Sequence, residues 1–394
     1  MASMSSCPPL VVTGQQIGAG WSPALSVVKA LAALVQARRL GGGAVYWLAD
    51  EDHDRLEVAS VVGFQEGHLR RHRFEFAAPA GTATGWLPWG PVHQAQARDL
   101  WGELPEALGP TLRDHVLALG APLWERGLTP FSPTEPGRRA AIQEELERWR
   151  SLDLETDLRR QAERLAAEGA PLPLDPRQQG AWFALDPATG LRLRLEPGSP
   201  LRRGWWLSPG AALRPLMQSL LLPATHAVLG PAERAYWRLT EPLWERVGLA
   251  PPEILARPSV AVLPKGLALE AGLLEELREG RWEHFAPHVE DPPSARLGQP
   301  LPDPAWGPRL ADRFRAEVAR TRARLGRLDR RLQRDRAAAA LGTDPERLRQ
   351  RLFPFNRPQE RVLPGVLWLR DRALLDRMIK GLETLQPLLL LEES

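Results

Sequence analysis

A strand that ends in a glycine-rich loop and leads into a helix stands near the start of the chain, and it constrains the fold more than any other segment. Residues 10–13 (LVVT) form a short apolar run, and residues 23–39 carry apolar side chains at helical spacing behind Ser22, a residue type that caps helices. The glycine run 41–43 ends that helix, and residues 44–50 (AVYWLAD) form a second apolar strand. A strand, helix and strand in this order predict a right-handed crossover between parallel strands.

The composition is that of a globular protein with more than one structural part. The chain has 394 residues, of which 43% are hydrophobic and 25% charged. Cys7 is the single cysteine, which excludes an intramolecular disulfide and fits a reducing compartment. The N-terminus lacks a signal-peptide pattern, and no apolar run approaches the roughly 18 residues that span a bilayer. We therefore predict a cytoplasmic protein that does not insert into membranes.

The alternation of strands and helices is interrupted and then resumes. Residues 134–168 predict a long helical stretch, and residues 181–195 alternate across a turn, as a β-hairpin does. The segments that follow have the α/β pattern again, and they are a helix near 211–221, a strand at 225–230, a helix at 232–246 and a strand at 259–263. We expect an α/β fold with a Rossmann-type parallel sheet core and an inserted connecting region. The predicted segments are 1–125 for the first part of the core, 126–203 for the connecting insertion and 204–300 for the second part.

The last part of the chain, 301–394, is expected to hold an α-helical coiled coil and a closing helix. The coiled-coil seam has apolar or small residues spaced 4, 3, 4, 3 and 4 apart, at Phe314, Val318, Thr321, Leu325, Leu328 and Leu332. Residues 309–336 contain 11 arginines and four acids, so their net charge is 11 − 4 = +7. This charge suggests nucleic acid as one partner, but an apolar seam favours pairing with another helix and hence a homodimer.

The loop after the first strand is the first candidate site. Gly14 and Gly18 permit close approach of a ligand, while Thr13, Gln15 and Gln16 provide neutral hydrogen-bond donors and acceptors. Backbone N–H groups at the start of the following helix are expected to bind a phosphate or carboxylate. The glycine spacing matches neither the dinucleotide-binding fingerprint nor the P-loop. The alternative is a tight turn whose glycines only relieve crowding.

Lys29 lies two turns into the predicted helix. Only three of the 51 basic residues are lysines, at Lys29, Lys265 and Lys380. In a chain where arginine is the usual cation, a lysine near the loop suggests that a compact ammonium group is needed there.

The sequence DEDHD, residues 50–54, follows the second strand directly. Ligands bind outside the carboxyl ends of strands in open α/β sheets, so these side chains lie where chemistry is expected. Crowded carboxylates raise one another's pKa, which makes Asp52 or His53 a candidate base, with Asp54 as a binding residue. Alternatively, the acids hold Mg²⁺ or a substrate ammonium group. The structural alternative is an acidic helix start followed by a helix over 54–62.

A third candidate corner lies at 213–237, where a strand ends at Gly230 and a helix begins. Glu233 and Tyr236 on that helix, and Arg214 on the preceding one, could face the same cleft as the first two corners. The alternative is a helix start with a core aromatic residue.

Taken in order along the chain, these segments resemble the BshC family, the cysteine ligases of bacillithiol biosynthesis. The matching stretches are TGQQ at 13–16, WLADEDHD at 47–54, LRPL at 213–216, LGPAERAYW at 229–237, ARPS at 256–259 and LFPFNRPQERVL at 352–363. The resemblance implies a Rossmann-type core, a connecting helical region and a coiled coil used for dimerisation. It also implies that L-cysteine is joined to glucosaminyl-malate by an amide bond. Because amide formation needs an activated carboxyl group, the implied cofactor is a nucleotide, ATP or ADP.

The resemblance assigns roles to the three corners. The catalytic candidates are Asp52, His53 and Lys29, with the substrate amine near Asp52 and His53 and the activated carboxyl at the 13–20 loop. The binding candidates are Thr13, Gly14, Gln15, Gln16, Gly18, Asp54, Arg214, Gly230, Glu233, Tyr236, Arg257 and Ser259, and no residue is assigned as a metal ligand.

This chain departs from the family pattern in length and at single positions. It is shorter than typical members, and Ser219 stands where an acidic residue is usual. The HIGH and KMSKS motifs of class I synthetases do not occur. The competing hypotheses are a structural or nucleotide-binding subunit without catalysis, and a nucleic-acid-binding protein.

Overall fold

The computed structural model describes residues 8–65, 68–172, 174–176, 180–267, 269–270, 272–279, 281–285, 302–303 and 305–393. Cys7 lies outside the described residues. The chain forms two compact units, of which the first comprises residues 1–260 and 360–392 and the second residues 261–359. The four predicted segments are not tested by this division, and their boundaries stay a prediction.

A five-stranded parallel sheet forms the centre of the first unit. Its strand order is β10-β9-β1-β2-β5, and every pair described is parallel. The strands are β1 (Leu10–Gln15), β2 (Gly43–Leu48), β5 (Leu128–Phe131), β9 (His226–Leu229) and β10 (Glu253–Ala256). Counted along the chain, this is the order 5-4-1-2-3, which is that of a Rossmann-type sheet, and the order reverses between β1 and β9. The predicted fold class is confirmed.

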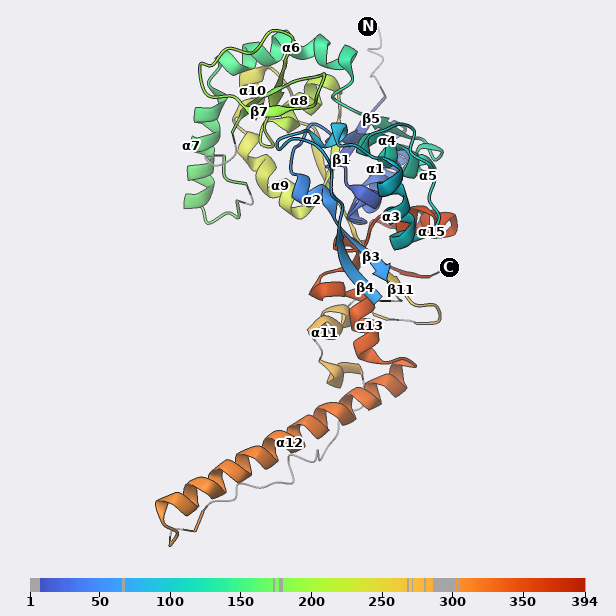
Figure 1. Cartoon of the computed structure of the whole chain (residues 1–394), viewed down its shortest axis with the longest axis vertical. Helices are drawn as coiled ribbons and strands as arrows, with labels where there is room; N and C mark the ends of the chain where they lie inside the picture. Colours follow the sequence, from blue (N-terminus) through green and yellow to red (C-terminus); the bar gives the residue numbers. More distant parts are fainter. Residues whose placement is uncertain are drawn as a thin grey trace, which may run out of the picture. The chain divides into compact units, whose positions relative to one another are not determined.

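Helices and short strands surround this sheet in the first unit. They are η1 (Ala19–Trp21), α1 (Leu25–Leu40), α2 (Arg55–Ala59), β3 (Ser60–Gln65), β4 (His68–Arg73), η2 (Thr84–Trp86), α3 (Pro91–Trp101), α4 (Leu112–Leu119), α5 (Ala121–Trp124), α6 (Pro136–Ser151), α7 (Leu154–Ala167), β6 (Trp182–Leu185), β7 (Arg192–Arg194), β8 (Trp206–Pro209), α8 (Arg214–Leu221), α9 (Pro231–Trp237), η3 (Arg238–Thr240), α10 (Leu243–Val247), α14 (Val366–Leu369), α15 (Arg372–Leu382) and β12 (Leu388–Glu392). Figure 1 shows α6, α7, α8 and α10 as one group and α3, α4 and α5 as another.

Alternate residues of the central strands pack against different layers. Val12, Val45 and Trp47 belong to a buried cluster that includes side chains of α6, α7 and α8. Tyr46 points to the other face, where its ring centroid lies 4.9 Å from that of Trp21. Both faces of β1 and β2 are therefore buried, which explains why these strands are continuous apolar runs in the sequence.

Two strands of the sheet were not predicted, and one predicted strand lies elsewhere. β5 contains a proline, and β10 has exposed residues at the sheet edge, so neither carries the apolar run of a buried strand. The predicted strand 259–263 forms as β11 (Ser259–Leu263) but is not part of the five-stranded sheet.

The connecting insertion contains a helix pair and a small antiparallel sheet. The long helical stretch is broken at Asp153, whose φ of 52° separates α6 from α7. The predicted hairpin forms as β6 and β7, and β8 adds a third strand in the order β7-β6-β8. The predicted helix 232–246 is likewise divided into α9, η3 and α10.

The start of α1 differs from the prediction. The residue before the helix is Ala24 rather than Ser22, and its backbone N–H donates to the carbonyl of Leu363 at 2.7 Å. The N–H groups of Ser26 and Val27 are bonded to the carbonyls of residues 23 and 24. The amides of Ala24, Ser26 and Val27 are therefore bonded within the protein, and the anion site expected at this helix start stays a prediction that rests on the other amides of the loop.

The C-terminal segment returns to the first unit. Glu360 is 2% exposed, and its carboxylate accepts the backbone N–H of Val260 at 2.8 Å and pairs with Arg257 at 2.9 Å. Further along, Gly365 donates its N–H to the carbonyl of Trp21 at 3.1 Å. Residues 363–365 therefore pack beside the start of α1.

The second unit is mainly helical. Its elements are α11 (Leu273–Glu279), η4 (Trp282–Phe285), α12 (Pro308–Leu341), α13 (Pro345–Leu352) and η5 (Pro354–Asn356). Figure 1 shows α12 as one uninterrupted helix. The seam residues Leu328 and Leu332 on α12 are 44% and 39% exposed. In the part of the chain that is described, no helix has both the length and the apolar character to cross a membrane.

Candidate functional site

A cavity of about 270 Å³ lies at the point where the strand order reverses. Its lining comes from the carboxyl ends of β1, β2 and β9 and from helices α2, α8 and α9, and consists of Thr13, Gly14, Gln15, Gln16, Trp47, Ala49, Asp52, Glu57, Ala211, Arg214, Pro215, Gln218, Leu229, Glu233, Tyr236 and Trp237. This is where open α/β sheets bind their ligands. The structure therefore brings the three predicted corners together at one cavity.

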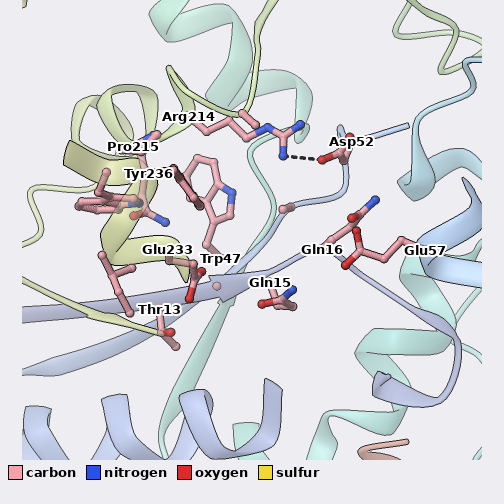
Figure 2. A pocket seen from close by; sticks show the side chains of 16 residues that line it. Thr13, Gln15, Gln16, Trp47, Asp52, Glu57, Arg214, Pro215, Glu233 and Tyr236 are labelled. Carbon is pink, nitrogen blue, oxygen red and sulfur yellow. Dashed lines mark hydrogen bonds and ion pairs between the residues drawn. The ribbon is translucent and has the colours of Figure 1, made fainter. Parts of the chain in front are cut away.

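Asp52 and Arg214 form an ion pair in the cavity wall. Nη1 of Arg214 donates to Oδ2 of Asp52 at 2.6 Å, and their side chains are 15% and 20% exposed (Figure 2). Burial alone raises the pKa of Asp52, but the guanidinium of Arg214 outweighs it and holds that pKa below its usual range. Asp52 therefore stays anionic at neutral pH and is a poor proton acceptor.

The other acids of DEDHD do not line the cavity. Asp50 is fully buried, and its Oδ2 accepts hydrogen bonds from Ser132 at 2.6 Å and Thr134 at 3.0 Å. Glu51 is also fully buried and forms an ion pair with Arg139. These two carboxylates hold the connecting region against the end of β2, which is a structural role.

His53 and Asp54 are not part of the cavity lining. Asp54 caps α2, because its Oδ1 accepts the backbone N–H of Glu57 at 3.1 Å. Nδ1 of His53 lies 2.8 Å from Nη1 of Arg192. The alternative of a helix start at 54 is thus partly correct, but α2 ends at Ala59 and the chain continues as β3 rather than as a helix to 62.

The TGQQ segment forms the floor of the cavity. The hydroxyl of Thr13 donates to the carbonyl of Val228 at 2.9 Å, which joins β1 to β9. Gly14 has no room for a side chain, because a Cβ atom there would lie 2.6 Å from the carbonyl oxygen of Trp47. The Nε2 amide of Gln16 donates to the carbonyl of Asp54 at 3.3 Å. This bond links the loop after β1 to the DEDHD segment.

Lys29 lies beneath the cavity rather than in its lining. Its ammonium group is fully buried and donates to Glu233 Oε1 at 2.6 Å, to Gln15 Oε1 at 3.2 Å and to the carbonyl of Gly14. Burial lowers the pKa of Lys29, and the Glu233 carboxylate only partly opposes this. Lys29 thus holds the floor in place, and nothing in its position brings it to a substrate.

Glu233 and Tyr236 line the cavity from α9. Oε2 of Glu233 accepts the backbone N–H of Gly230 at 2.8 Å, so the residue caps its own helix while its other oxygen meets Lys29. Burial raises the pKa of Tyr236, and its hydroxyl therefore stays protonated.

Five predicted binding residues lie outside the cavity lining, of which Asp54 caps α2 and Gly230 donates its backbone N–H to Glu233. Gly18 accepts a backbone hydrogen bond from Trp21 in the turn η1, and Arg257 is paired with Glu360. The backbone N–H of Ser259 donates to the carbonyl of Pro387 at 2.8 Å. Arg257 and Ser259 therefore contact the C-terminal segment of the first unit rather than the cavity.

Glu57 is a cavity residue that the sequence did not single out. It lies beside Gln16, across the cavity from Arg214 and Tyr236 in Figure 2. Desolvation in the cavity wall, together with the carboxylates of Asp54 and Asp52, raises the pKa of Glu57. A carboxylate with a raised pKa that faces a cavity is a candidate general base. Trp47 and Gln218 also line the cavity and were not predicted to do so.

The sequence and the family resemblance together suggest two cofactors, a nucleotide and Mg²⁺, and the described residues bear on both. Among the described residues, no three His, Cys, Asp or Glu side chains gather in a way that could hold a metal ion. At the start of α1, the N–H groups of Ala24, Ser26 and Val27 are bonded within the protein and are not available to a phosphate. The binding of a nucleotide and of Mg²⁺ stays a prediction.

Comparison with known proteins decides the family. A family model described as "Bacillithiol biosynthesis BshC, N-terminal Rossmann-like domain" matches residues 203–258. A relative from Thermus thermophilus named "Putative cysteine ligase BshC" is 31% identical over 94% of this chain and 86% of its own length. The chain belongs to the BshC family. A second relative of that name, from Solibacter usitatus, is 26% identical over 81% of this chain and 65% of its own length.

The BshC match coincides with one side of the cavity. Residues 203–258 contain α8, β9 and α9, and these elements carry Arg214, Glu233 and Tyr236. Among solved structures, a glutamate tRNA ligase from Elizabethkingia meningosepticum aligns with 71% of this BshC chain and 54% of its own, at 14% identity and a TM-score of 0.31. A likeness this loose carries no argument about the activity.

Proposed function

We propose that the protein is the ligase that joins L-cysteine to glucosaminyl-malate in the synthesis of bacillithiol, in the cytoplasm. Membership of the BshC family supports the reaction class. The observation that carries the proposal is the cavity at the strand-order reversal, which is lined by both the Asp52–Arg214 ion pair and Glu57. Such a site can bind a carboxyl group and an amine together.

Amide formation sets two requirements for this site. The sugar amine must lose a proton before its nitrogen attacks the cysteine carbonyl, and the carbonyl carbon must then lose an activated oxygen leaving group. We assign the proton acceptor to Glu57, because its side chain lines the cavity and desolvation raises its pKa above the ordinary glutamate value. Asp52, which remains anionic, serves instead to fix Arg214. This assignment replaces Asp52 and His53 as the candidate bases.

Arg214 supplies the positive charge of the site. Its guanidinium is held by Asp52 at 2.6 Å, so it needs no reorganisation when negative charge develops on the carbonyl oxygen. The Gln16 side chain and the Tyr236 hydroxyl line the same cavity and can donate hydrogen bonds to the substrates. ATP or ADP remains our prediction for the source of activation, and no step here depends on it.

The exposed seam of α12 supports a homodimer in the proposed function. Leu328 and Leu332 are exposed in the single chain, and a second copy of the helix would bury them in a coiled coil. The arginines on the flanks of the helix would then remain in solvent.

Thiol profiling of a strain that lacks the gene tests the proposed function. We expect bacillithiol to disappear and glucosaminyl-malate to accumulate, and the wild-type gene to restore the thiol. Glu57→Gln should fail to restore it, whereas Glu163→Gln, the same change at an exposed position on α7, should restore it fully. A deletion strain with an intact bacillithiol pool would contradict the proposal and favour a structural subunit.

A further inference from the structure

Arg192 belongs to the inserted hairpin, yet its guanidinium is the group that meets the imidazole of His53. Nη1 lies 2.8 Å from Nδ1 of His53, and the Arg192 side chain is 1% exposed. Nε donates to Oγ of Ser208 at 3.0 Å, and Nη2 donates to the carbonyl of Pro209 at 2.8 Å. The guanidinium carbon also lies 3.8 Å from the ring centroid of Phe183. The guanidinium is therefore fixed in one orientation.

The contact with Arg192 determines which nitrogen of His53 carries a proton. A guanidinium has only N–H donors, so Nδ1 of His53 must accept the hydrogen bond. The hydrogen of the neutral ring is then on Nε2. The charged groups around the ring are Arg192, Arg214, Asp52 and Asp54. Burial and the two arginines lower the pKa of His53 more than the two acids raise it, which agrees with a neutral ring.

The hairpin is tied to the end of β2 by more than this contact. Oγ of Ser208, which accepts from Arg192, donates to Oε2 of Glu51 at 2.9 Å. Glu51 is in turn paired with Arg139 of α6. The chain of buried partners thus connects three elements of the insertion with the DEDHD segment.

We propose that Arg192 is a positioning residue of the active site that holds His53 as the neutral tautomer with its proton on Nε2. The backbone N–H of His53 donates to Oδ1 of Asp52 at 2.8 Å, so a fixed His53 also keeps Asp52 directed at Arg214. His53 is then a hydrogen-bond donor and not a base. The catalytic consequence rests on the proposed function, but the tautomer does not.

Nitrogen NMR of the full-length protein labelled at histidine tests the tautomer directly. Of the eight histidines, the His53 signals are assigned by their loss in His53→Gln. We expect an unprotonated Nδ1 and a protonated Nε2 at pH 7, and titration to the charged ring only below the ordinary histidine range. A wild-type His53 that is charged at pH 7, or that carries its proton on Nδ1, would overturn the proposal without the use of any Arg192 variant.

Three variants test the role of Arg192. Arg192→Met should mix the two tautomers, shift the titration of His53 upward and lower kcat about tenfold, the effect of about 1.4 kcal/mol in the barrier. Arg192→Lys keeps a charged donor and should restore most of the wild-type spectrum. Arg194→Met is the matched control, because Arg194 lies on the same strand with a side chain that is 46% exposed, and it should leave the spectrum unchanged.

The outcomes separate this proposal from the proposed function. A folded Arg192→Met protein with an unaltered His53 spectrum would show that Arg192 does not position the ring. Conversely, a wild-type protein could give the expected His53 spectrum but fail to restore bacillithiol in the deletion strain. That result would contradict the proposed function and leave the tautomer assignment intact.

Discussion

Oδ2 of Asp52 lies 2.6 Å from Nη1 of Arg214, although the two residues are 162 positions apart in the sequence. The pair joins the segment after β2 to the first turn of α8 across the reversal point of the sheet. The pair therefore contributes both to the stability of the cavity wall and to the charge inside the cavity.

Removing the cation of this pair should destabilise the protein. We expect Arg214→Met to lower the free energy of unfolding by about 3 kcal/mol, because it leaves the Asp52 carboxylate largely buried and without its partner. Urea unfolding followed by circular dichroism measures the change. Arg234→Met is the control on the neighbouring helix α9 and should change the unfolding free energy by less than about 0.5 kcal/mol. Equal losses in both variants would contradict this reading.

The same pair predicts a dependence of stability on pH. The pKa of Asp52 is lower in the folded protein than in the unfolded chain, where it is about 3.9. Its contribution to stability is therefore fully present above that value and is lost as the pH falls toward the folded pKa. This contribution is absent in Asp52→Asn. We therefore expect the unfolding free energy of the variant to fall less steeply than that of the wild type between about pH 5 and pH 3. Parallel curves would show that Asp52 is not the group responsible.

Glu57 should control the acid side of the activity profile. Glu57→Gln is expected to lower kcat by about 10² to 10⁴, the usual contribution of a general base. As the pH is lowered, the kcat/KM of the wild type should begin to fall above the pKa of an ordinary glutamate. The reason is that the base works only when it is deprotonated, and the pKa of Glu57 is raised. Steady-state assays from pH 5 to 9 measure both effects, and a Glu57→Gln enzyme with wild-type kcat would remove Glu57 from the mechanism.

Lys29 should matter for folding more than for the chemistry. We expect Lys29→Met to lower the unfolding free energy by about 3 to 5 kcal/mol, because Glu233 and the Gly14 carbonyl lose a buried charged donor. Lys380→Met, at an exposed position on α15, is the matched control and should be nearly neutral. A Lys29→Met protein of normal stability but without activity would instead restore Lys29 as a catalytic residue.

The α12 seam can be tested by the mass of the protein in solution. Leu328→Asp combined with Leu332→Asp should convert a dimer to a monomer, because buried carboxylates are not tolerated at a and d positions. Arg330→Asp changes the charge of the same helix outside the seam and should leave the dimer intact. Analytical ultracentrifugation distinguishes the two, and a wild-type monomer at micromolar concentration would contradict the predicted homodimer.

The sequence predicted the parallel core because its signals are local. β1, β2 and the hairpin β6–β7 are marked by apolar runs, alternation and turn residues within ten or so positions. β5 and β10 are short and lack that pattern, so only their neighbours in the sheet make them strands. The broken helix at Asp153 depends on a backbone conformation that no periodicity reveals.

The site was predictable as a meeting of motifs but not as a set of roles. Parallel strand ends placed TGQQ and DEDHD together, and the Gln16 to Asp54 hydrogen bond follows from that. Which acid faces the cavity depends on Arg139, Arg192 and Arg214, which come from distant parts of the chain. The contact at the start of α1 could not be predicted for the same reason, because Leu363, which accepts the N–H of Ala24, comes from a distant part of the sequence.

The hydrogen bond between Val260 and Glu360 joins the point where the chain leaves the first unit to the point where it returns from the second. Because these two points are adjacent, the second unit is an insertion whose two ends meet at one place in the first unit. A homologue could lengthen, shorten or exchange that stretch without rethreading the strands of the five-stranded sheet.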